Sequence, residues 1–331
     1  MTDMKAAVIG AGSWGMALAA LLAKNGHKVT LWSWQPADLE EIRATGTIAS
    51  KLPKAQLPAS IELNENISEA CHLKEMIVVA IPFAAVRTVL AQLQPILTDG
   101  QIIVHVSKGI EQHSLKTLDE ITAEYFPDHP TAILSGPSHA EEVVQAMPTS
   151  VVIASRQNQL ISTLQDVFMN SSFRVYGSND IKGVELGAAV KNVIALAAGI
   201  SDGLGFGDNA KAALITRGMA EIRRLGQALG ADDYTFTGLS GMGDLIVTCT
   251  SLHSRNRKAG YLIGQGQSPE QAIAAVGMVV EGFYSAVACK ELADACQVEM
   301  PIVIQMNEVL FHGKNPRQAV EDLMLRDKKF E

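Results

Sequence analysis

Lys191 is the residue whose surroundings in the sequence most strongly suggest chemistry. It is the only charged residue between Leu186 and Ile200, in an otherwise apolar stretch of helical character, and Asn192 follows it directly. A lysine in such a stretch either extends to the helix surface, meets a partner or has a function. Because desolvation and neighbouring cations favour proton exchange near neutral pH, Lys191 is a candidate acid/base for interconverting an alcohol and a ketone.

A second candidate is Asp244, which stands between glycines and an apolar run. It either caps the helix that follows, as aspartates after glycine often do, or pairs with Lys191 and orients it. Residues 254–258 form a dense cationic and amide-bearing turn that begins Ser254, Arg255, Asn256. Such donors match a phosphate group through charge-assisted hydrogen bonds. The alternative for this turn is a solvated basic loop.

Near the start of the chain, a glycine-rich turn has the spacing of a dinucleotide site. Gly10, Gly12 and Gly15 follow an apolar run and precede a helix-forming segment. In this pattern Gly10 makes the turn, Gly12 lets a pyrophosphate approach, and Gly15 lets the helix pack on its strand. The phosphate then meets the unpaired N–H groups at the helix N-terminus. The alternative is glycines that serve the turn and packing alone.

Two further segments follow expected strands, where ligands bind in doubly wound folds. Lys108 comes directly after one strand and is either a site residue or a simple edge charge. Residues 135–141 follow another strand and offer backbone N–H groups and hydroxyls, or form only a turn. This segment includes His139, for which no acidic partner spacing supports an acid/base role.

The region after the second strand bears on the choice of cofactor. An NAD-specific site normally shows an acid about 20 residues past the glycines, which hydrogen-bonds the ribose hydroxyls. Residues 32–35 contain none, so both NAD and NADP remain open as cofactors. Arg43 and Lys51 are the cations available nearby.

These residues require a sheet and a helical domain to position them. A chain of 331 residues exceeds the usual single core. Apolar runs predict strands that alternate with helical segments, at residues 27–32, 76–81, 84–93, 101–107, 115–125 and 131–134, with later strands at 150–154 and 173–176. Beyond residue 180 the strand signal nearly disappears, and 181–200, 210–229 and most of 268–292 predict long helices.

The expected fold is therefore α/β, with a doubly wound, Rossmann-type parallel sheet followed by an all-α C-terminal domain. We expect a dinucleotide-binding domain over residues 1–180 and an all-helical substrate and catalytic domain over 181–331. The large apolar helices also predict a homodimer.

Composition excludes several classes of function. A net charge of -8 argues against nucleic acid and anionic lipid surfaces as partners. No stretch is expected to reach the ~18 apolar residues of a membrane span, so we predict no membrane insertion. The first strand starts almost at the N-terminus, leaving no room for a signal peptide, and a cytoplasmic location is expected. The four cysteines are predicted to be buried, reduced thiols, and no ligand cluster predicts a metal site.

Together these motifs resemble the bacterial NAD(P)-dependent sn-glycerol-3-phosphate dehydrogenases. The resemblance extends over nearly the whole chain, at residues 9–15, 107–110, 135–138, 190–193, 205–209, 213–218, 241–245, 254–257 and 280–282. The family interconverts dihydroxyacetone phosphate and sn-glycerol 3-phosphate with NADH or NADPH, and supplies glycerol 3-phosphate for phospholipid synthesis. The resemblance thus implies a small phosphate ester as substrate.

The resemblance also implies roles for individual residues. Lys191 matches the proton donor/acceptor, with Asp244 and Thr248 near it. The substrate positions comprise Lys191 and Asp244 together with Lys108, Gly136, Ser138, Ser254, Arg255 and Asn256. The cofactor positions are Gly10, Gly12, Ser13, Trp14, Gly15, Trp34, Lys108, Ala140, Arg255, Val279 and Glu281. Two departures stand out: His139 replaces a usual Phe, and Trp34 replaces a His or Arg found in many members near the adenosine ribose.

Two other functions fit the same architecture. A related two-domain 3-hydroxyacid or 6-phosphogluconate dehydrogenase would need a carboxylate site rather than the compact turn at residues 254–257. A non-catalytic dinucleotide-sensing regulator would have no reason to keep Lys191 and Asp244 together. Following the absorbance of NADH or NADPH in the presence of dihydroxyacetone phosphate distinguishes these hypotheses.

Overall fold

The computed structural model describes residues 3–328 and 330, and the chain divides into two compact units. The sheet unit comprises the chain up to Lys108 together with Thr117–Val184, and the helical unit comprises Gly109–Lys116 and the chain from Glu185 onward. Each unit has its own hydrophobic core. The main boundary therefore lies after Val184 rather than at the expected residue 180. In addition, residues 109–116 belong to the helical unit, although they lie within the sequence of the sheet unit.

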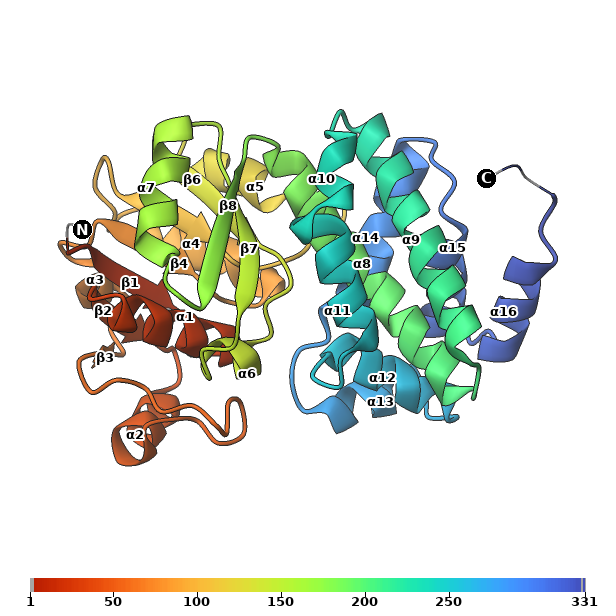
Figure 1. The fold of residues 1–331 in the computed structure, drawn as a ribbon, viewed down its shortest axis with the longest axis horizontal. Coiled ribbons are helices and arrows are strands. Elements are labelled where there is room, and N and C mark those ends of the chain that lie inside the picture. The colour runs from red at the N-terminus through yellow and green to blue at the C-terminus, as the bar shows by residue number, and fades with distance from the viewer. Residues whose placement is uncertain (1–2, 329, 331) are drawn as a thin grey trace. The chain divides into compact units, whose positions relative to one another are not determined.

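The sheet unit is built on one eight-stranded sheet in the order β3-β2-β1-β4-β5-β6-β7-β8 (Figure 1). Its strands are β1 (Lys5–Ile9), β2 (Lys28–Trp32), β3 (Glu62–Asn64), β4 (Met76–Val79), β5 (Ile102–His105), β6 (Thr131–Ser135), β7 (Thr149–Ala154) and β8 (Phe173–Ser178). The six strands from β1 to β6 pair in parallel, which confirms the doubly wound fold predicted from strand–helix alternation.

The sheet is not wholly parallel, which corrects the prediction. β7 pairs antiparallel with β6, and β8 pairs parallel with β7. The reason lies in the connection from β6 to β7, whose only helix is the four-residue α6 (Ala140–Val143). Four helical residues rise only ~6 Å, whereas a five-residue strand is ~17 Å long. The helix is too short to carry the chain back along the sheet, so β7 returns beside β6 in the opposite direction.

Helices alternate with the strands of the sheet unit. They are α1 (Ser13–Lys24), α2 (Pro36–Thr45), α3 (Ile67–Cys71), the 3-10 turn η1 (Phe83–Ala85), α4 (Val86–Leu93), α5 (Leu118–Tyr125), α6 and α7 (Asn158–Phe168). The sequence pattern predicted none of α2, α3, α6, α7 and the short β3. It also placed the start of α5 at Leu115, which instead has a positive φ of 60°. The helix begins after a capping box formed by Thr117 and Glu120.

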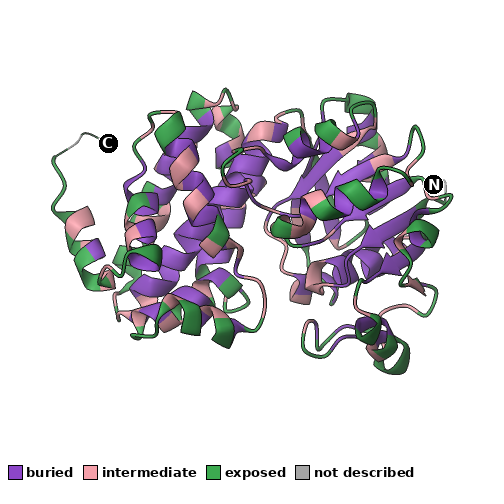
Figure 2. Ribbon diagram, turned by 180° about the vertical axis from the view of Figure 1, so that it is seen from behind, coloured by how far each residue is buried: buried purple, intermediate pink, exposed green. Residues whose placement is uncertain are grey.

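The helical unit contains α8 (Ile181–Gly203), most of which belongs to it, α9 (Asp208–Ala228), α10 (Asp233–Thr237), the π-helical turn η2 (Leu239–Gly243), α11 (Asp244–Thr250), α12 (Arg255–Gly264), α13 (Pro269–Val276), α14 (Glu281–Ala295), α15 (Pro301–Phe311) and α16 (Pro316–Met324). No strand occurs among its described residues, as the sequence predicts. Figure 2 shows that the chain from α8 onward has buried helices at its centre and exposed faces outside.

The central helix α8 corrects the expectation that no segment is long and apolar enough to span a membrane. By length and composition it does pass that test. Every residue of its apolar window is nevertheless buried by other parts of the chain. This burial is typical of the core helix of a globular domain, which is hydrophobic on all sides because neighbours surround it.

Glycines on α8 and α12 let these two helices approach closely. A Cβ at Gly199 would lie 2.1 Å from the backbone oxygen of Arg257, and one at Gly260 would lie 2.0 Å from that of Leu196. Small residues of this kind allow helix backbones to pack at short distance. The contact places Arg257, in the first turn of α12, beside Gly199 in the C-terminal half of α8.

The cysteines are free thiols, as predicted, but not all are buried. Cys71, Cys249 and Cys289 are buried, and burial raises the pKa of each to about 12. Cys296, which follows the last turn of α14, is only partly buried and packs against the edge of the core.

Candidate functional site

In the helical unit, the structure brings Lys191, Asp244 and Thr248 together. Nζ of Lys191 donates hydrogen bonds to Oδ1 of Asp244 and to Oγ1 of Thr248, both at 2.7 Å. All three residues are at least 95% buried. The Thr248 hydroxyl itself donates to the backbone oxygen of Asp244 at 2.6 Å, so its oxygen lone pairs face the ammonium. Lys191 is therefore a buried, partnered lysine and not one that extends to the surface.

The chain segment before Asp244 explains its position. The π-helical turn η2 precedes α11, and a Cβ at Gly241 would lie only 2.2 Å from the backbone oxygen of Phe236. This tight turn places Asp244 at the first residue of α11, while Gly243 occupies the capping position without a side-chain hydrogen bond. The capping alternative for Asp244 is thus wrong, because its carboxylate points to Lys191 instead. Short π-helical segments often occur at functional sites.

Next to Lys191, the side chain of Asn192 connects α8 to the basic turn. Its Oδ1 accepts a hydrogen bond from Nδ2 of Asn256 at 3.0 Å, and Oδ1 of Asn256 accepts one from the backbone N–H of Gly282 at 2.9 Å. Both asparagines are buried. These bonds hold the Asn256 carboxamide in one orientation between α8, α12 and α14. Sequence reasoning noted Asn192 only as a neighbour of Lys191.

The basic turn is only partly available to a ligand. Ser254 caps α12, its Oγ accepting the backbone N–H of Arg257 at 3.2 Å. Arg257 is paired with Asp202 on α8 at 2.6 Å, and Lys211 on α9 binds the other oxygen of the same aspartate at 2.8 Å. Arg255 is exposed, and its side chain makes no hydrogen bond or ion pair with any described residue. Sequence reasoning missed Asp202, because nothing in the local pattern links residues 202 and 257.

In the sheet unit, the glycine-rich turn has the predicted strand, turn and helix. Gly10 has a φ of 119°, which favours glycine, and a Cβ there would lie 2.4 Å from the backbone oxygen of Ala80. A Cβ at Gly15 would lie 1.9 Å from the backbone oxygen of Gly10, whereas one at Gly12 would meet nothing within 4 Å. The first turn of α1 carries no acidic residue and no side-chain cap. Its N–H groups and the open space at Gly12 thus form a cradle that fits a pyrophosphate.

Trp34 and its neighbours follow β2. Trp34 is 72% exposed. Four residues later, Asp38 is buried, accepts a hydrogen bond from Oγ of Ser33 at 2.8 Å and pairs with Nζ of Lys51 at 2.7 Å. The backbone oxygen of Lys51 in turn accepts a hydrogen bond from Oγ of Ser13, in the first turn of α1, at 2.7 Å. Sequence reasoning named Lys51 but missed Asp38, because Asp38 lies beyond the strand end, on α2.

The other candidates lie in both units. In the sheet unit, Lys108 is half-buried after β5, Gly136 has a φ of 142°, Oγ of Ser138 donates to the backbone oxygen of Gly136 at 3.0 Å, and Ala140 begins α6. His139 stands at the capping position of α6 without capping it. In the helical unit, Val279 and Glu281 are half-buried around the start of α14.

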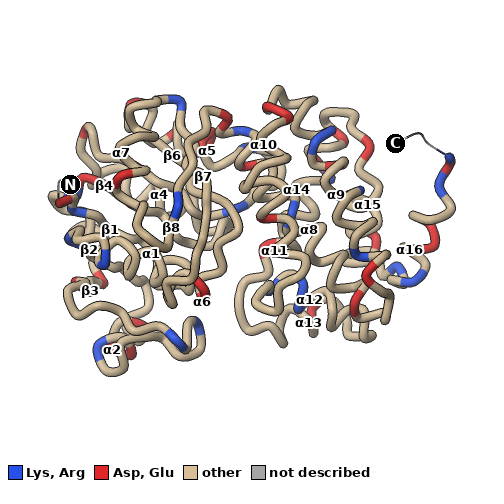
Figure 3. Tube along the Cα trace, viewed as in Figure 1, with Lys and Arg blue, Asp and Glu red and all other residues tan. Residues whose placement is uncertain are grey.

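Charge and possible metal ligands are dispersed over the described chain. Lys and Arg residues are scattered along both units rather than collected in one segment (Figure 3). The described residues contain no group of three or more His, Cys, Asp or Glu side chains placed to hold a metal ion. A ligand phosphate must therefore find its cations locally, and Arg255 and Lys258 are the exposed ones in the basic turn.

Comparisons with known proteins cover the whole chain. Residues 5–161 match the family model of the NAD-dependent glycerol-3-phosphate dehydrogenase N-terminus, and residues 180–321 match that of its C-terminus. A protein of Fusobacterium nucleatum named glycerol-3-phosphate dehydrogenase (NAD(P)+) is 52% identical over 99% of this chain and 98% of its own length. A relative of the same name from Agathobacter rectalis is 49% identical over 98% of this chain and 96% of its own length.

A solved structure agrees with these relatives. The crystal structure of glycerol-3-phosphate dehydrogenase from Coxiella burnetii matches with a TM-score of 0.95 and 38% identity, covering 98% of this chain and 99% of that one. A single family thus accounts for the motifs and for the fold of both units. The chain belongs to the NAD-dependent glycerol-3-phosphate dehydrogenases.

Proposed function

We propose that the chain interconverts dihydroxyacetone phosphate and sn-glycerol 3-phosphate with NADH or NADPH, and that Lys191 is its proton donor and acceptor. The observation that carries the proposal is the pairing of the buried Lys191 ammonium with Asp244 and Thr248. A buried lysine needs such partners to remain charged, and a charged amine is the acid that ketone reduction requires. A bound nicotinamide supplies the hydride.

Asp244 and Thr248 act on Lys191 rather than on the substrate in this proposal. The carboxylate keeps the amine protonated until the carbonyl oxygen gains negative charge. Thr248 limits the rotation of the amine, because its hydroxyl proton is already used by the backbone oxygen of Asp244. In the reverse reaction the same amine takes the proton of the alcohol. Fixed partners of this kind preorganise the charge that stabilises the transition state.

Arg255 and Asn256 are proposed to hold the substrate phosphate. Arg255 is exposed and has no partner among the described residues, whereas Arg257 in the same turn is occupied by Asp202. Asn256 is fixed in place by Asn192 and the backbone N–H of Gly282. We therefore assign phosphate binding to Arg255 and Asn256, with Ser254 as the cap that shapes their turn.

In the sheet unit, the open cradle at Gly12 and the uncapped first turn of α1 support the proposed dinucleotide site. Ser13, Trp14 and Trp34 would line it with the three glycines. The residues that follow β5 and β6, namely Lys108, Gly136, Ser138 and Ala140, and the start of α14, with Val279 and Glu281, remain proposed substrate or cofactor positions.

The experiment compares dihydroxyacetone phosphate with unphosphorylated dihydroxyacetone, following the absorbance of NADH and NADPH. We expect turnover of the phosphate ester and almost none of dihydroxyacetone, because phosphate binding energy is used in the transition state. Arg255→Ala should cost at least ~1.5–3 kcal/mol of transition-state stabilisation, the range for a lost charge-assisted hydrogen bond, as calculated from kcat/KM for the ester. Comparable kcat/KM values for the two ketones would contradict the proposal. Turnover of a 3-hydroxyacid or 6-phosphogluconate instead, or cofactor binding without turnover, would favour the other two functions.

The substrate class, the use of the product, the cellular location and the oligomeric state are also proposed. A small phosphate ester is the expected partner, the product is expected to serve phospholipid synthesis, and the location is expected to be cytoplasmic. A homodimer is expected from the apolar helices, and sedimentation of the purified chain tests it.

A further inference from the structure

The helical unit contains a cavity whose lining residues include none of those assigned to the reaction. It has a volume of about 350 Å³ and is lined by α8, α9, α15, α16 and the residues that follow α16. This size lies at the lower end of the ~300–1,000 Å³ that small-molecule pockets span. At ~30 Å³ for a group the size of a water molecule, it holds about a dozen such groups.

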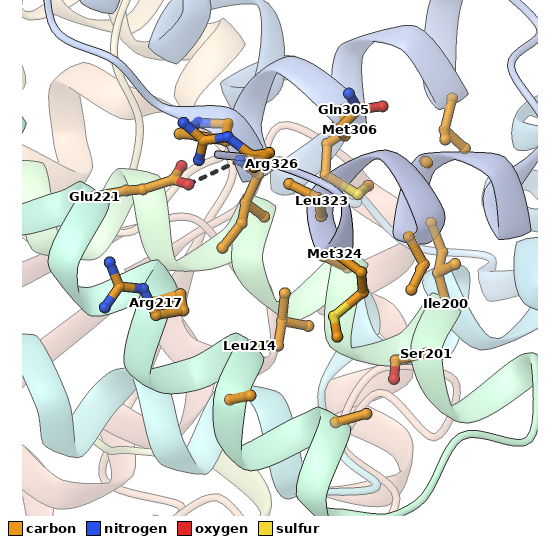
Figure 4. Close-up of a pocket in the computed structure, with 18 of the residues that line it drawn as sticks. Ile200, Ser201, Leu214, Arg217, Glu221, Gln305, Met306, Leu323, Met324 and Arg326 are labelled. Atoms are coloured by element: carbon orange, nitrogen blue, oxygen red, sulfur yellow. Dashed lines mark hydrogen bonds between the residues drawn. The ribbon is translucent and has the colours of Figure 1, made fainter. Parts of the chain in front are cut away.

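The lining of this cavity is divided into an apolar and a charged end. Figure 4 shows Arg217, Glu221 and Arg326 toward one side, and Ile200 and Ser201 toward the other. The apolar lining is mostly aliphatic or thioether, and includes Leu214, Met306, Val309, Leu323 and Met324. The lining also contains Oε1 of Gln305, a buried oxygen with no hydrogen-bond partner among the described residues.

Helix α9 shows how the sequence produces this division. Its pocket-lining residues Ala210, Ala213, Leu214, Arg217, Glu221 and Arg224 recur at the spacing of one helix face. The N-terminal part of this face is apolar and the C-terminal part is charged. Ala213 and Arg217 are exposed, although they belong to residues 213–218, a family motif to which the proposed reaction assigns no role. Neither core packing nor the proposed chemistry therefore explains Ala213 and Arg217 on this face.

Charged side chains of both signs line the charged end, and arginines outnumber acids there. Three arginines line it, namely Arg217, Arg224 and Arg326, against the acids Glu221 and Asp327. Outside the lining, Glu299 pairs with Arg326, and its backbone oxygen accepts hydrogen bonds from Arg224 at 3.2 and 2.9 Å. Both oxygens of Glu221 are already used, because they accept the backbone N–H groups of Ile302 and Val303 at 2.8 and 3.3 Å. Burial raises the pKa of Glu221 to about 7, against the effect of those hydrogen bonds and of Arg224 and Arg326. Its carboxyl group is thus only partly charged at neutral pH.

We propose that this cavity is a binding site for a linear aliphatic molecule with an anionic head, a carboxylate or a phosphate. The chain occupies the end lined by Leu214, Met306 and Leu323, and the head lies at the guanidinium groups of Arg217 and Arg224. Guanidinium recognises both head groups by charge-assisted hydrogen bonds, and the aliphatic lining offers the tail no polar partner. The capacity of about a dozen groups suits a medium-length chain.

The test is calorimetric titration of the full chain with decanoate, decyl phosphate and decanol at pH 7. We expect one equivalent of either anion to bind, with decanol at least about tenfold weaker, as expected for loss of a charge-assisted interaction. Comparison of the two anions tells which head group the site prefers. Binding is measured without turnover, so this result does not depend on the proposed dehydrogenase reaction.

Paired variants locate the site. Ala213→Trp puts a large side chain into the cavity and should abolish binding, whereas Ala212→Trp, at the exposed neighbour outside the lining, should leave it within about twofold. Arg224→Gln should weaken decanoate but not decanol, and Arg223→Gln, outside the lining, should change neither. Thermal unfolding of each variant verifies the fold.

Three results would overturn the proposal. One is the absence of saturable binding of either anion below its aggregation concentration. Another is equal loss of binding in Ala212→Trp and Ala213→Trp. The third is dissociation of an oligomer by Ala213→Trp but not by Ala212→Trp, which would assign the cavity to a second copy of the chain.

Discussion

The glycine-rich turn of the sheet unit and the Lys191 cluster of the helical unit are built in opposite ways. The turn uses consecutive residues, and its shape depends on the absence of side chains at Gly10 and Gly15. The cluster uses side chains that lie 53 and 57 residues apart in the sequence, on α8 and α11. The first is a backbone site, formed by the N–H groups and the conformation of the turn. The second depends on three particular functional groups, so substitution there should remove chemistry more readily than it removes the fold.

The largest expected effect is at Lys191. Lys191→Met keeps a strong helix former of similar length, but single-turnover hydride transfer should fall by ~10²–10⁴-fold, the contribution of positioned proton transfer. Lys191→Arg should not rescue it, because guanidinium stays protonated near neutral pH. Lys182→Met, at the other lysine of α8, is the matched control and should retain wild-type transfer.

Cofactor titration by fluorescence should show normal binding in both Lys191 variants, because the proposed dinucleotide site lies largely in the other unit. Transfer within about tenfold of wild type, 1.4 kcal/mol at most, would remove Lys191 from the mechanism. Lys108 would then be the next candidate for the acid. That result would also mean that the function of the Lys191 cluster does not depend on particular side chains, and the contrast with the glycine-rich turn would not hold.

The next effect is a pH dependence of stability with opposite signs in the two units. In the sheet unit, burial lowers the pKa of His105 to about 4, and its Nε2 bonds Thr122 at 2.6 Å. His105 therefore contributes stability above pH 6.5 that is lost as the pH falls toward 4. In the helical unit, the pKa of Glu221 is raised from 4.5 to about 7. Its contribution is present below pH 4.5 and is lost as the pH rises through 7.

Each of these pKa shifts changes the free energy of unfolding by about 3 kcal/mol at most. Hydrogen exchange of β5 and α9 amides between pH 4 and 8 measures the two units separately. His105→Gln should flatten the dependence in the sheet unit, and Glu221→Gln that in the helical unit. Parallel slopes in the two units would show that they unfold together and that the contrast does not extend to stability.

A smaller effect separates the glycines of the turn. Gly15→Ala should destabilise the sheet unit by ~1–3 kcal/mol, the usual cost of overpacking, because its Cβ would meet the backbone oxygen of Gly10 at 1.9 Å. Gly12→Ala has open space and should leave the unfolding temperature unchanged while weakening NADH binding. Equal unfolding temperatures for the two variants would mean that the backbone of the turn can move to accommodate a Cβ at Gly15. The geometry of the turn would then not require glycine at that position.

The smallest effect concerns the cofactor. We expect NADH and NADPH both to be oxidised, and a preference for NADH beyond about a thousandfold, roughly 4 kcal/mol, would contradict this. Lys51→Met removes the cation that neutralises Asp38, so kcat/KM for NADPH should fall about tenfold relative to NADH, near 1.4 kcal/mol. Lys54→Met, at an exposed lysine nearby, should leave the ratio unchanged.

The sequence alone determined the parts of this protein that depend on short-range physics. Alternation of apolar runs with helical segments predicts the parallel core of the sheet and the helical second unit, because periodicity along a few turns decides which elements form. The spacing of Gly10, Gly12 and Gly15 predicts the turn, because Gly10 needs a positive φ and a Cβ at Gly15 would meet the backbone oxygen of Gly10. Lys191 stood out because a charge in an apolar helix needs an explanation wherever the helix lies.

Only the tertiary structure decided which distant groups meet. Arg257 of the basic turn is held in an ion pair with Asp202. Likewise, Asn192 orients Asn256, and Asp38 pairs with Lys51. No local sequence pattern links the members of these pairs. The reversal of β7 depends on what a four-residue helix can span, and the segment at residues 109–116 joins the helices rather than the sheet. The physical reason is that an ion pair or buried hydrogen bond forms where packing brings its partners together. Packing depends on all the helices and strands at once, not on the residues next to each partner.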